Sequence, residues 1–227
     1  DFKYGVVAWY DSVISPAGLH AMSLDGSSVV DLTTERCTCY GAPQVGGRQV
    51  VYEGWQTGNR DIWMVNVDTL AEEHLVDHPA PQFDPVFDGQ WVVWHDGRND
   101  PSHDPYFYRT NTDIYGMNLE NREVVPICTN SAHQNGMDVR DGFVAWSDLR
   151  NAEEPNNPRA VRPNVDIYLY ELATGREVRV TSSPAFEVLP QIWGRRIFFV
   201  SYDDVGIMNA GRRALFMLDL DEAGLLD

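Results

Sequence analysis

One unit of sequence occurs twice in the middle of the chain, and it constrains the fold more than any other feature. Residues 91–99 read WVVWHDGRN, and Asp113-Ile114-Tyr115 follows them after a loop. Residues 143–151 read FVAWSDLRN, and Asp166-Ile167-Tyr168 follows in the same way. An apolar strand, a loop with acidic and basic residues, and a second strand have therefore been copied. Copied units of this kind indicate a repeat architecture.

A glycine precedes the apolar strand of each unit, and these glycines recur along the whole chain. They are Gly5, Gly47, Gly89, Gly142 and Gly194, at intervals of 42, 42, 53 and 52 residues. Periods of about 40 to 50 residues with several short strands per unit are typical of β-propellers, in which each blade is a four-stranded antiparallel sheet. We therefore predict an all-β chain with one domain, 1–227: a β-propeller of five four-stranded antiparallel blades, or part of a longer propeller. The predicted blades are 1–36, 37–79, 80–131, 132–184 and 185–227.

Two strands test this prediction in detail. Pro126 lies in the predicted fourth strand of the third unit, and because proline lacks the N–H that a ladder needs, that strand should lie at a sheet edge. In the fifth unit the predicted fourth strand, Ala223–Leu226, is short, and it is either weak or truncated.

The repeat also resembles a known family. The pattern Gly-x-x-Val-Val-Trp-x-Asp-x-Arg-Asn over residues 89–99, followed by Asp-Ile-Tyr and then by Glu-Val-x-x-Ile over residues 123–127, is similar to the TolB-type β-propeller repeat. The resemblance covers essentially the whole chain and implies a secreted or cell-surface protein of bacteria or archaea. It implies little about function, because such propellers serve as binding platforms, as parts of envelope complexes and as enzymes. Relatives that are oligogalacturonate lyases hold a metal with His and Gln, and this chain has no pattern that matches theirs residue by residue.

The composition excludes some partners. Thirty-four acidic residues against 17 basic ones give a net charge of −17, which argues against nucleic acid and permits cations or basic proteins. No apolar run approaches the roughly 20 residues of a transmembrane helix. The sequence begins at Asp1 without Met, which suits either a secreted chain after removal of its signal peptide or a chain that has been trimmed. We expect an extracellular, periplasmic or cell-surface location.

The three cysteines, Cys37, Cys39 and Cys128, are too few for a disulfide scaffold and lack the spacing of a zinc site. Cys37 and Cys39 are too close in sequence for easy bridge geometry, so a disulfide would join Cys128 to one of them. Buried free thiols are the alternative.

Two long loops, Asp96–Thr112 and Asp148–Val165, should open on one face of the predicted propeller. Loops longer than about 12 residues in a compact domain often carry function. The first loop has several hard oxygen ligands of the type that Ca²⁺ prefers, although their spacing matches no known calcium loop. The candidate Ca²⁺ ligands are Asp96, Asn99, Asp100 and Asp104.

Other side chains of the same face are candidates for ligand binding. Aromatic residues in loops often mark binding surfaces, and histidines from several units, His78 among them, could converge there. The candidate ligand-binding residues are Trp55, His95, His103, Tyr106, Tyr108 and His133.

Repeated residues are interpreted differently. Asp96 with Arg98 and Asp148 with Arg150 recur at equivalent positions, as does a related segment at 59–61, and this favours charge-assisted pairing that holds loop stems or neighbouring blades. The repeated aromatic residues at one strand position should pack in the core rather than bind sugar. They are Trp9, Tyr52, Trp94 and Trp146.

Three functions remain open. The first is a non-enzymatic binding module that takes a protein or a glycan on the long-loop face. The second is a polysaccharide-active enzyme, a glycoside hydrolase or lyase, with Asp84, Asp138 and Glu187 as carboxylates at the channel mouth. The third is a self-assembling surface protein, in which copies of the chain associate.

Overall fold

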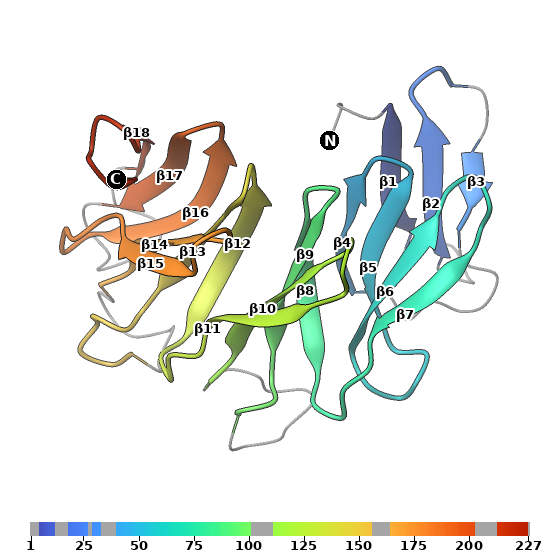
Figure 1. Cartoon of the computed structure of the whole chain (residues 1–227), viewed down its shortest axis with the longest axis horizontal. Coiled ribbons are helices and arrows are strands. Elements are labelled where there is room, and N and C mark those ends of the chain that lie inside the picture. Colours follow the sequence, from blue (N-terminus) through green and yellow to red (C-terminus); the bar gives the residue numbers. More distant parts are fainter. Residues whose placement is uncertain are drawn as a thin grey trace. The chain divides into compact units, whose positions relative to one another are not determined.

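The computed structural model describes residues 5–11, 18–26, 29–32, 40–100, 111–155, 164–202 and 213–226, with the side chains of residues 40 and 41 left out. These residues are all-β, and there is no helix among them. They form five antiparallel sheets of three or four strands (Figure 1). The chain divides into two compact units, one built on β1 to β9 and the other on β12 to β18, and each unit is described by itself.

The first two sheets belong to the first unit. The three-stranded sheet consists of β1 (Val6–Asp11), β2 (Gly18–Ser23) and β3 (Val29–Asp31), and the next sheet consists of β4 (Tyr40–Gly46), β5 (Gln49–Gly54), β6 (Asp61–Asn66) and β7 (Glu72–Val76). In both sheets the strands lie side by side in sequence order.

The remaining sheets repeat this order. They consist of β8 (Gln82–Phe87), β9 (Trp91–Asp96), β10 (Asp113–Asn118) and β11 (Val124–Cys128); of β12 (Gln134–Arg140), β13 (Phe143–Asp148), β14 (Asp166–Glu171) and β15 (Arg176–Arg179); and of β16 (Phe186–Trp193), β17 (Arg196–Tyr202) and β18 (Arg213–Asp219). The all-β prediction is confirmed. The number of blades and their boundaries stay predictions.

Alternation of side chains across each sheet explains how the sheets pack. In the β12–β15 sheet, Ala145 is paired with Leu169, and Trp146 is paired with Tyr168 on the opposite face. Residues directly opposite each other in antiparallel strands point to the same face, so each sheet has two faces to cover. Both faces of β13 are buried along its whole length.

The core lies between neighbouring sheets within each unit. One cluster combines residues of β1 and β2 with residues of β4 and β5, and a second joins β5, β6 and β7 to β8, β9 and β10. In the second unit, a cluster joins β13 and β14 to β16 and β17. Trp94 and Trp146 are fully buried and Tyr52 nearly so, which confirms them as core residues, whereas Trp9 is half-buried.

The first strand of each four-stranded sheet, and β16 as well, carries a β-bulge. In three of these strands the bulged residue has a positive φ: 49° at Asp84, 58° at Gly136 and 57° at Leu189. A bulge with a residue in the left-handed region bends the strand and re-aims its side chains. The same strand position thus carries the same backbone distortion in three sheets, although only one of the three residues is glycine.

Two predictions about the outer strands have different outcomes. β11, which contains Pro126, lies at the edge of its sheet, as predicted. The predicted strand at residues 223–226 is wrong: residues 221–224 form a turn. The N–H groups of Ala223 and Leu225 donate to the carbonyls of Asp219 and Leu220, at 3.1 Å and 3.0 Å. Their hydrogen bonds are local and do not form a ladder.

Cys128 has a free, buried thiol, so the alternative of a free thiol is the one that the structure supports. A bridge from Cys128 to Cys37 or Cys39 is not formed. Those two residues lie outside the described part of the chain.

Candidate functional site

The repeated loop stem is built around one carboxylate. In β9, Asp96 accepts hydrogen bonds from Trp94 Nε1 (2.9 Å), from the Arg98 backbone N–H (2.9 Å) and from Arg98 Nε and Nη2 (2.8 Å and 2.6 Å). The Arg98 guanidinium also lies over the ring of Tyr115, 3.9 Å from its centre. The carboxylate is fully buried, and its negative charge is balanced by the arginine. Burial of a charge is tolerated only when it is paired and hydrogen-bonded in this way.

The second copy repeats this arrangement in the other unit. Asp148 accepts from Trp146 Nε1 at 2.8 Å, from the Arg150 N–H at 2.8 Å and from Arg150 Nη2 at 2.7 Å. The Arg150 guanidinium lies 4.0 Å from the centre of the Tyr168 ring. The repeated aspartate and arginine therefore form the charge-assisted pairs in the loop stems that the repeat predicted.

An asparagine closes each of these stems. The Asn99 amide donates to Asp113, and the Asn151 amide donates to Asp166 at 2.8 Å. Each bond joins the start of a long loop to the first residue of the strand that follows it. In each case the hydrogen bond connects the two ends of the loop, so both ends lie next to each other at one end of the sheet.

The related segment at residues 59–61 uses different partners. Arg60 forms a bidentate ion pair with Glu53 of β5, at 2.5 Å and 2.7 Å, and both side chains are buried. The guanidinium lies 4.7 Å from the centre of the Phe83 ring. Burial raises the pKa of Glu53, and the hydrogen bonds and charge of Arg60 oppose that rise. The pairing is structural, as predicted, but its carboxylate comes from β5 and not from the adjacent Asp61.

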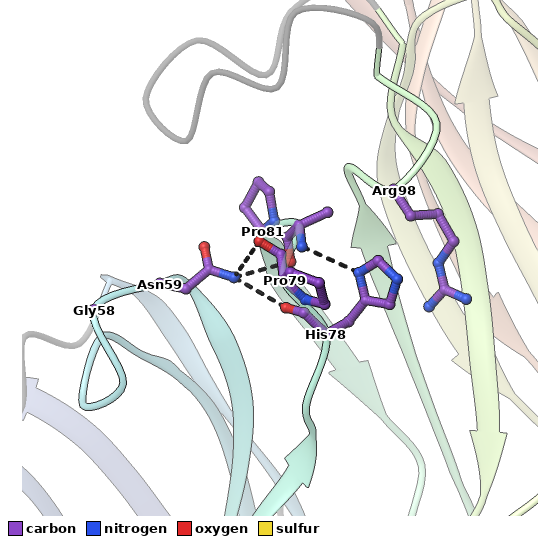
Figure 2. Close-up of a pocket in the computed structure, with 7 residues that line it drawn as sticks. Gly58, Asn59, His78, Pro79, Pro81 and Arg98 are labelled. Atoms are coloured by element: carbon purple, nitrogen blue, oxygen red, sulfur yellow. Dashed lines mark hydrogen bonds between the residues drawn. The ribbon is translucent and has the colours of Figure 1, made fainter.

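Asn59 fixes a short segment that leads into β8. Its Nδ2 donates to the carbonyls of His78 (3.1 Å), Pro79 (3.3 Å) and Ala80 (3.0 Å), as Figure 2 shows. The N–H of Ala80 in turn donates to Nδ1 of His78 at 3.1 Å. One amide therefore binds three successive carbonyls. The N–H of Ala80, in the same segment, holds the His78 ring.

These residues form a pocket of about 460 Å³ at the loop end of the first unit. It is lined by Gly58, Asn59, His78, Pro79, Ala80, Pro81 and Arg98. In Figure 2 the His78 ring lies on the side of the segment that faces Arg98. Because Asp96 and Tyr115 hold the guanidinium from two directions, Arg98 is fixed in place before any ligand arrives. The pocket combines fixed hydrogen-bonding groups with the apolar rings of two prolines, a composition typical of ligand sites.

Sequence reasoning missed this pocket. It placed His78 among the histidines of the loop face, but it assigned Asn59 and Arg98 only to structural pairing. The contact that creates the site joins Asn59 to carbonyls 19 to 21 residues further along the chain. No local pattern in the sequence reports such a contact.

The predicted ligand-binding residues have different surroundings. His95 is buried in β9 and its ring stacks on Phe83, with 5.3 Å between ring centres, so it packs in the core. Trp55 is half-buried in the loop after β5. His133 is half-buried in the second unit, where its backbone bonds to Pro155 and Leu149. His103, Tyr106 and Tyr108 lie outside the described residues.

The three predicted carboxylates occupy different positions along their strands. Asp84 is exposed at the bulge of β8, whereas Asp138 lies after the bulge of β12 and accepts the N–H of Ile192 at 2.6 Å. Glu187 precedes the bulge of β16 and is 5% exposed. One of its oxygens accepts from Ser183 at 2.7 Å, and the other is buried without a hydrogen-bond partner.

The predicted calcium ligands are mostly engaged. Both oxygens of Asp96 accept hydrogen bonds, the Asn99 amide donates to Asp113, and Asp100 is buried. Asp104 lies outside the described residues. Within the described ranges, no three His, Cys, Asp or Glu side chains come together as metal ligands. The Ca²⁺ site stays a prediction.

Comparison with known proteins identifies the fold. The chain aligns with TolB from Acinetobacter baumannii with a TM-score of 0.63 and 17% identity, over 95% of this chain and 54% of that one. The chain has a TolB-like propeller fold. It spans about half the length of that TolB chain. No protein-family model matches, and no curated protein matches.

Enzymes share the fold as well. The chain aligns with an oligogalacturonate lyase in complex with manganese (TM-score 0.64, 16% identity, 96% of this chain and 60% of that one). It also aligns with a prolyl endopeptidase (TM-score 0.69, 13% identity, 96% and 33%). At such identities the likeness concerns the fold alone. The described residues include no helix that could cross a membrane.

Proposed function

We propose that this chain is a binding module of an extracellular or envelope-associated TolB-like propeller, that it is not an enzyme, and that it takes its ligand on the long-loop face. The five sheets are five blades, 1–36, 37–79, 80–131, 132–184 and 185–227. The ligand is a glycan or a segment of protein.

The observation that carries this proposal is the pocket between Asn59, His78 and Arg98. The positive charge of Arg98 is already balanced by Asp96. The pocket therefore suits a neutral ligand that accepts hydrogen bonds better than it suits a free anion. The net charge of −17 also disfavours an anionic ligand. Hydroxyl and carbonyl oxygens of a sugar or a peptide would accept from Arg98 and His78, while Pro79 and Pro81 pack against apolar ring faces.

The test is a screen of the purified chain against an array of neutral glycans and an array of peptides, followed by titration of any binder. The substitution His78→Ala should weaken binding about five- to tenfold, which corresponds to the loss of one hydrogen bond. The matched control is His20→Ala, since His20 is also half-buried but lies in β2. If no array compound binds, or if the two variants bind equally, the proposal is wrong.

A second candidate is the polysaccharide-active enzyme with Asp84, Asp138 and Glu187. It is supported by the buried, unpartnered oxygen of Glu187 and by the likeness to a solved oligogalacturonate lyase. An unpartnered buried carboxylate oxygen carries a desolvation cost, which active sites often retain. The test is turnover of a glycan panel that includes oligogalacturonate, with and without Mn²⁺. If the wild type turns over a glycan and Glu187→Gln does not, the protein is an enzyme and the binding proposal is wrong. If the wild type turns over no glycan of the panel, the enzyme candidate is wrong.

A further inference from the structure

The interface between the β12–β15 sheet and the β16–β18 sheet has a polar layer at the end where β13 and β17 finish. Ser147 of β13 shares a face with Ala145, which belongs to the core cluster of this interface. Glu187 of β16 is paired with Ser201 of β17, and paired residues share a face. Ser201 alternates with Phe199, which packs in the same cluster. Ser147 and Glu187 therefore lie on the two facing sides of one interface.

Two oxygens of this layer are buried without a hydrogen-bond partner. Ser147 is 2% exposed, and the unpartnered atom is its Oγ. Glu187 is 5% exposed; its Oε1 accepts from Ser183 at 2.7 Å, whereas its Oε2 is the unpartnered atom. A Cβ on Gly136 would lie 3.6 Å from Ser147 Oγ and 3.7 Å from the backbone nitrogen of Leu189, two residues after Glu187. The hydroxyl thus lies near the segment of β16 that carries the carboxylate.

The equivalent interface in the first unit shows how such a layer is balanced. Glu53 of β5 is paired with Ile62, as Ser147 is paired with Ile167, so Glu53 and Ser147 hold the same position in their sheets. Arg60, the residue before β6, forms the buried bidentate ion pair with Glu53. The acid and the base of that pair cancel each other's charge.

The second unit has a carboxylate in this layer without an arginine. Val165, the residue before β14, takes the place of Arg60, and its carbonyl accepts the N–H of Glu187 at 3.0 Å. Gln82 in β8 and Gln134 in β12 hold the position of Glu187, two residues before the bulged residue, so the other sheets have a neutral side chain there. Among the residues that the structure describes, no basic side chain forms an ion pair with Glu187.

We propose that this layer binds one sodium or potassium ion, with Glu187 Oε2 and Ser147 Oγ as its side-chain ligands. A buried carboxylate needs a compensating charge, and both atoms are oxygen ligands of the kind that hard cations prefer. One carboxylate balances one positive charge, whereas Ca²⁺ would leave an excess of positive charge in the interior. The ion does for the second unit what the Arg60 guanidinium does for the first, and it links the two sheets.

The experiment measures the urea midpoint of the whole chain at one ionic strength while the cation is changed. NaCl, KCl and tetramethylammonium chloride at about 0.15 M screen surface charges equally, but tetramethylammonium is too large for a closed interior site. We expect a higher midpoint in NaCl or KCl than in tetramethylammonium chloride, because an ion that binds only the folded state stabilises it. The salt with the larger effect identifies the ion. Above its dissociation constant, a tenfold rise in that ion should lower the unfolding constant about tenfold.

Two substitutions remove the proposed ligands. Glu187→Gln gives β16 the residue that β8 and β12 already have, so the variant should fold and have the same midpoint in all three salts. Ser147→Ala should raise the cation concentration for half of the effect about fivefold, which corresponds to the loss of one neutral ligand. Its midpoint in tetramethylammonium chloride should not fall, because the hydroxyl has no partner in the protein. Glu177→Gln, the same change at a partly exposed acid of β15, is the matched control and should keep the full response.

The proposal is overturned if the wild type has the same midpoint in all three salts, as it would if water alone filled this layer. It is also overturned if Glu187→Gln or Ser147→Ala responds to the cation as the wild type does, or if Glu177→Gln loses the response as well. The measurement involves no glycan or peptide, so its outcome is independent of the binding function proposed for the pocket of the first unit.

Discussion

At the scale of single residues, the buried carboxylate of Asp148 links several parts of its loop stem. It accepts one hydrogen bond from Trp146 Nε1 and two from Arg150. Asp148→Asn keeps the size of the side chain but places an NH₂ group where two donors already point. We expect a loss of about 3 kcal/mol in the free energy of unfolding, as for other broken buried ion pairs. Urea denaturation of the two proteins measures it.

The control for this prediction changes the other acidic partner of the same arginine. Glu177 pairs with Arg150 at 2.6 Å but is partly exposed. Glu177→Gln should therefore cost less than about 1 kcal/mol. Equal losses in the two variants would show that burial of Asp148 is not what makes its pairing strong.

The thiol of Cys128 makes stability depend on pH at the alkaline end. Burial raises the pKa of Cys128 from 9.0 to about 12. Because the folded pKa is higher than the unfolded one, the folded state is favoured fully below pH 9, and this contribution is lost as pH rises from 9 towards 12. Between about pH 8 and about pH 10.5 the wild type should lose about 2 kcal/mol more unfolding free energy than Cys128→Ala does. Urea denaturation at both pH values measures this difference, and parallel losses in the two proteins would contradict it.

Residue roles were predictable from the sequence where the sequence repeats them. Asp96 and Asp148 with their arginines recur, and their structural role is what the structure shows. His95 does not recur, and it was predicted to bind ligand because it lies beside these residues. Its ring is instead stacked on Phe83. A buried histidine and an exposed one have the same sequence neighbours, so only packing distinguishes them.

At the scale of elements, the bulges of the first strands allow a direct test of backbone strain. Leu189 has a φ of 57° and is 58% exposed, while Gly136 occupies the same strand position with a φ of 58°. The left-handed region costs a non-glycine residue about 1 kcal/mol or more. Leu189→Gly should therefore be neutral or stabilise the fold by up to about 1 kcal/mol, and Gly136→Ala should destabilise it by about 1 kcal/mol.

A steric clash does not contribute to the effect of Gly136→Ala, because the added Cβ would lie 3.6 Å from its nearest neighbour, Ser147 Oγ, which is an ordinary van der Waals contact. Leu189→Ala serves as the control, since it removes the same exposed side chain but keeps a Cβ in the left-handed region. Urea midpoints of the three variants decide the matter. A gain in Leu189→Ala as large as that in Leu189→Gly would mean that the side chain, and not the backbone, is responsible.

Elements with a repeated pattern were predicted well, and the last outer strand was not. Leu225 and Leu226 resemble the start of an edge strand, but they pack against the core cluster of the second unit. The turn at Gly224, with a φ of 63°, directs them there. A pair of leucines serves a strand or a core equally well, so the sequence alone does not separate the two outcomes.

At the scale of the whole molecule, the net charge of −17 is a property that no single contact explains. Exposed ion pairs such as Arg48 with Asp68 and Arg195 with Asp221 contribute little each, because solvent screens them. Repulsion among the excess acidic residues acts over the entire surface and opposes the compact state. Its range shortens from about 30 Å at 0.01 M salt to about 8 Å at 0.15 M.

Added salt should therefore stabilise this protein, since it weakens a net repulsion more than it weakens the exposed pairs. We expect the urea midpoint to rise between about 0.01 M and about 0.15 M NaCl and to change less between about 0.15 M and about 0.3 M. Sucrose at equal osmolarity serves as the uncharged control. A midpoint that falls with salt would show that the ion pairs, and not the excess of acidic residues, dominate the electrostatics of the folded chain.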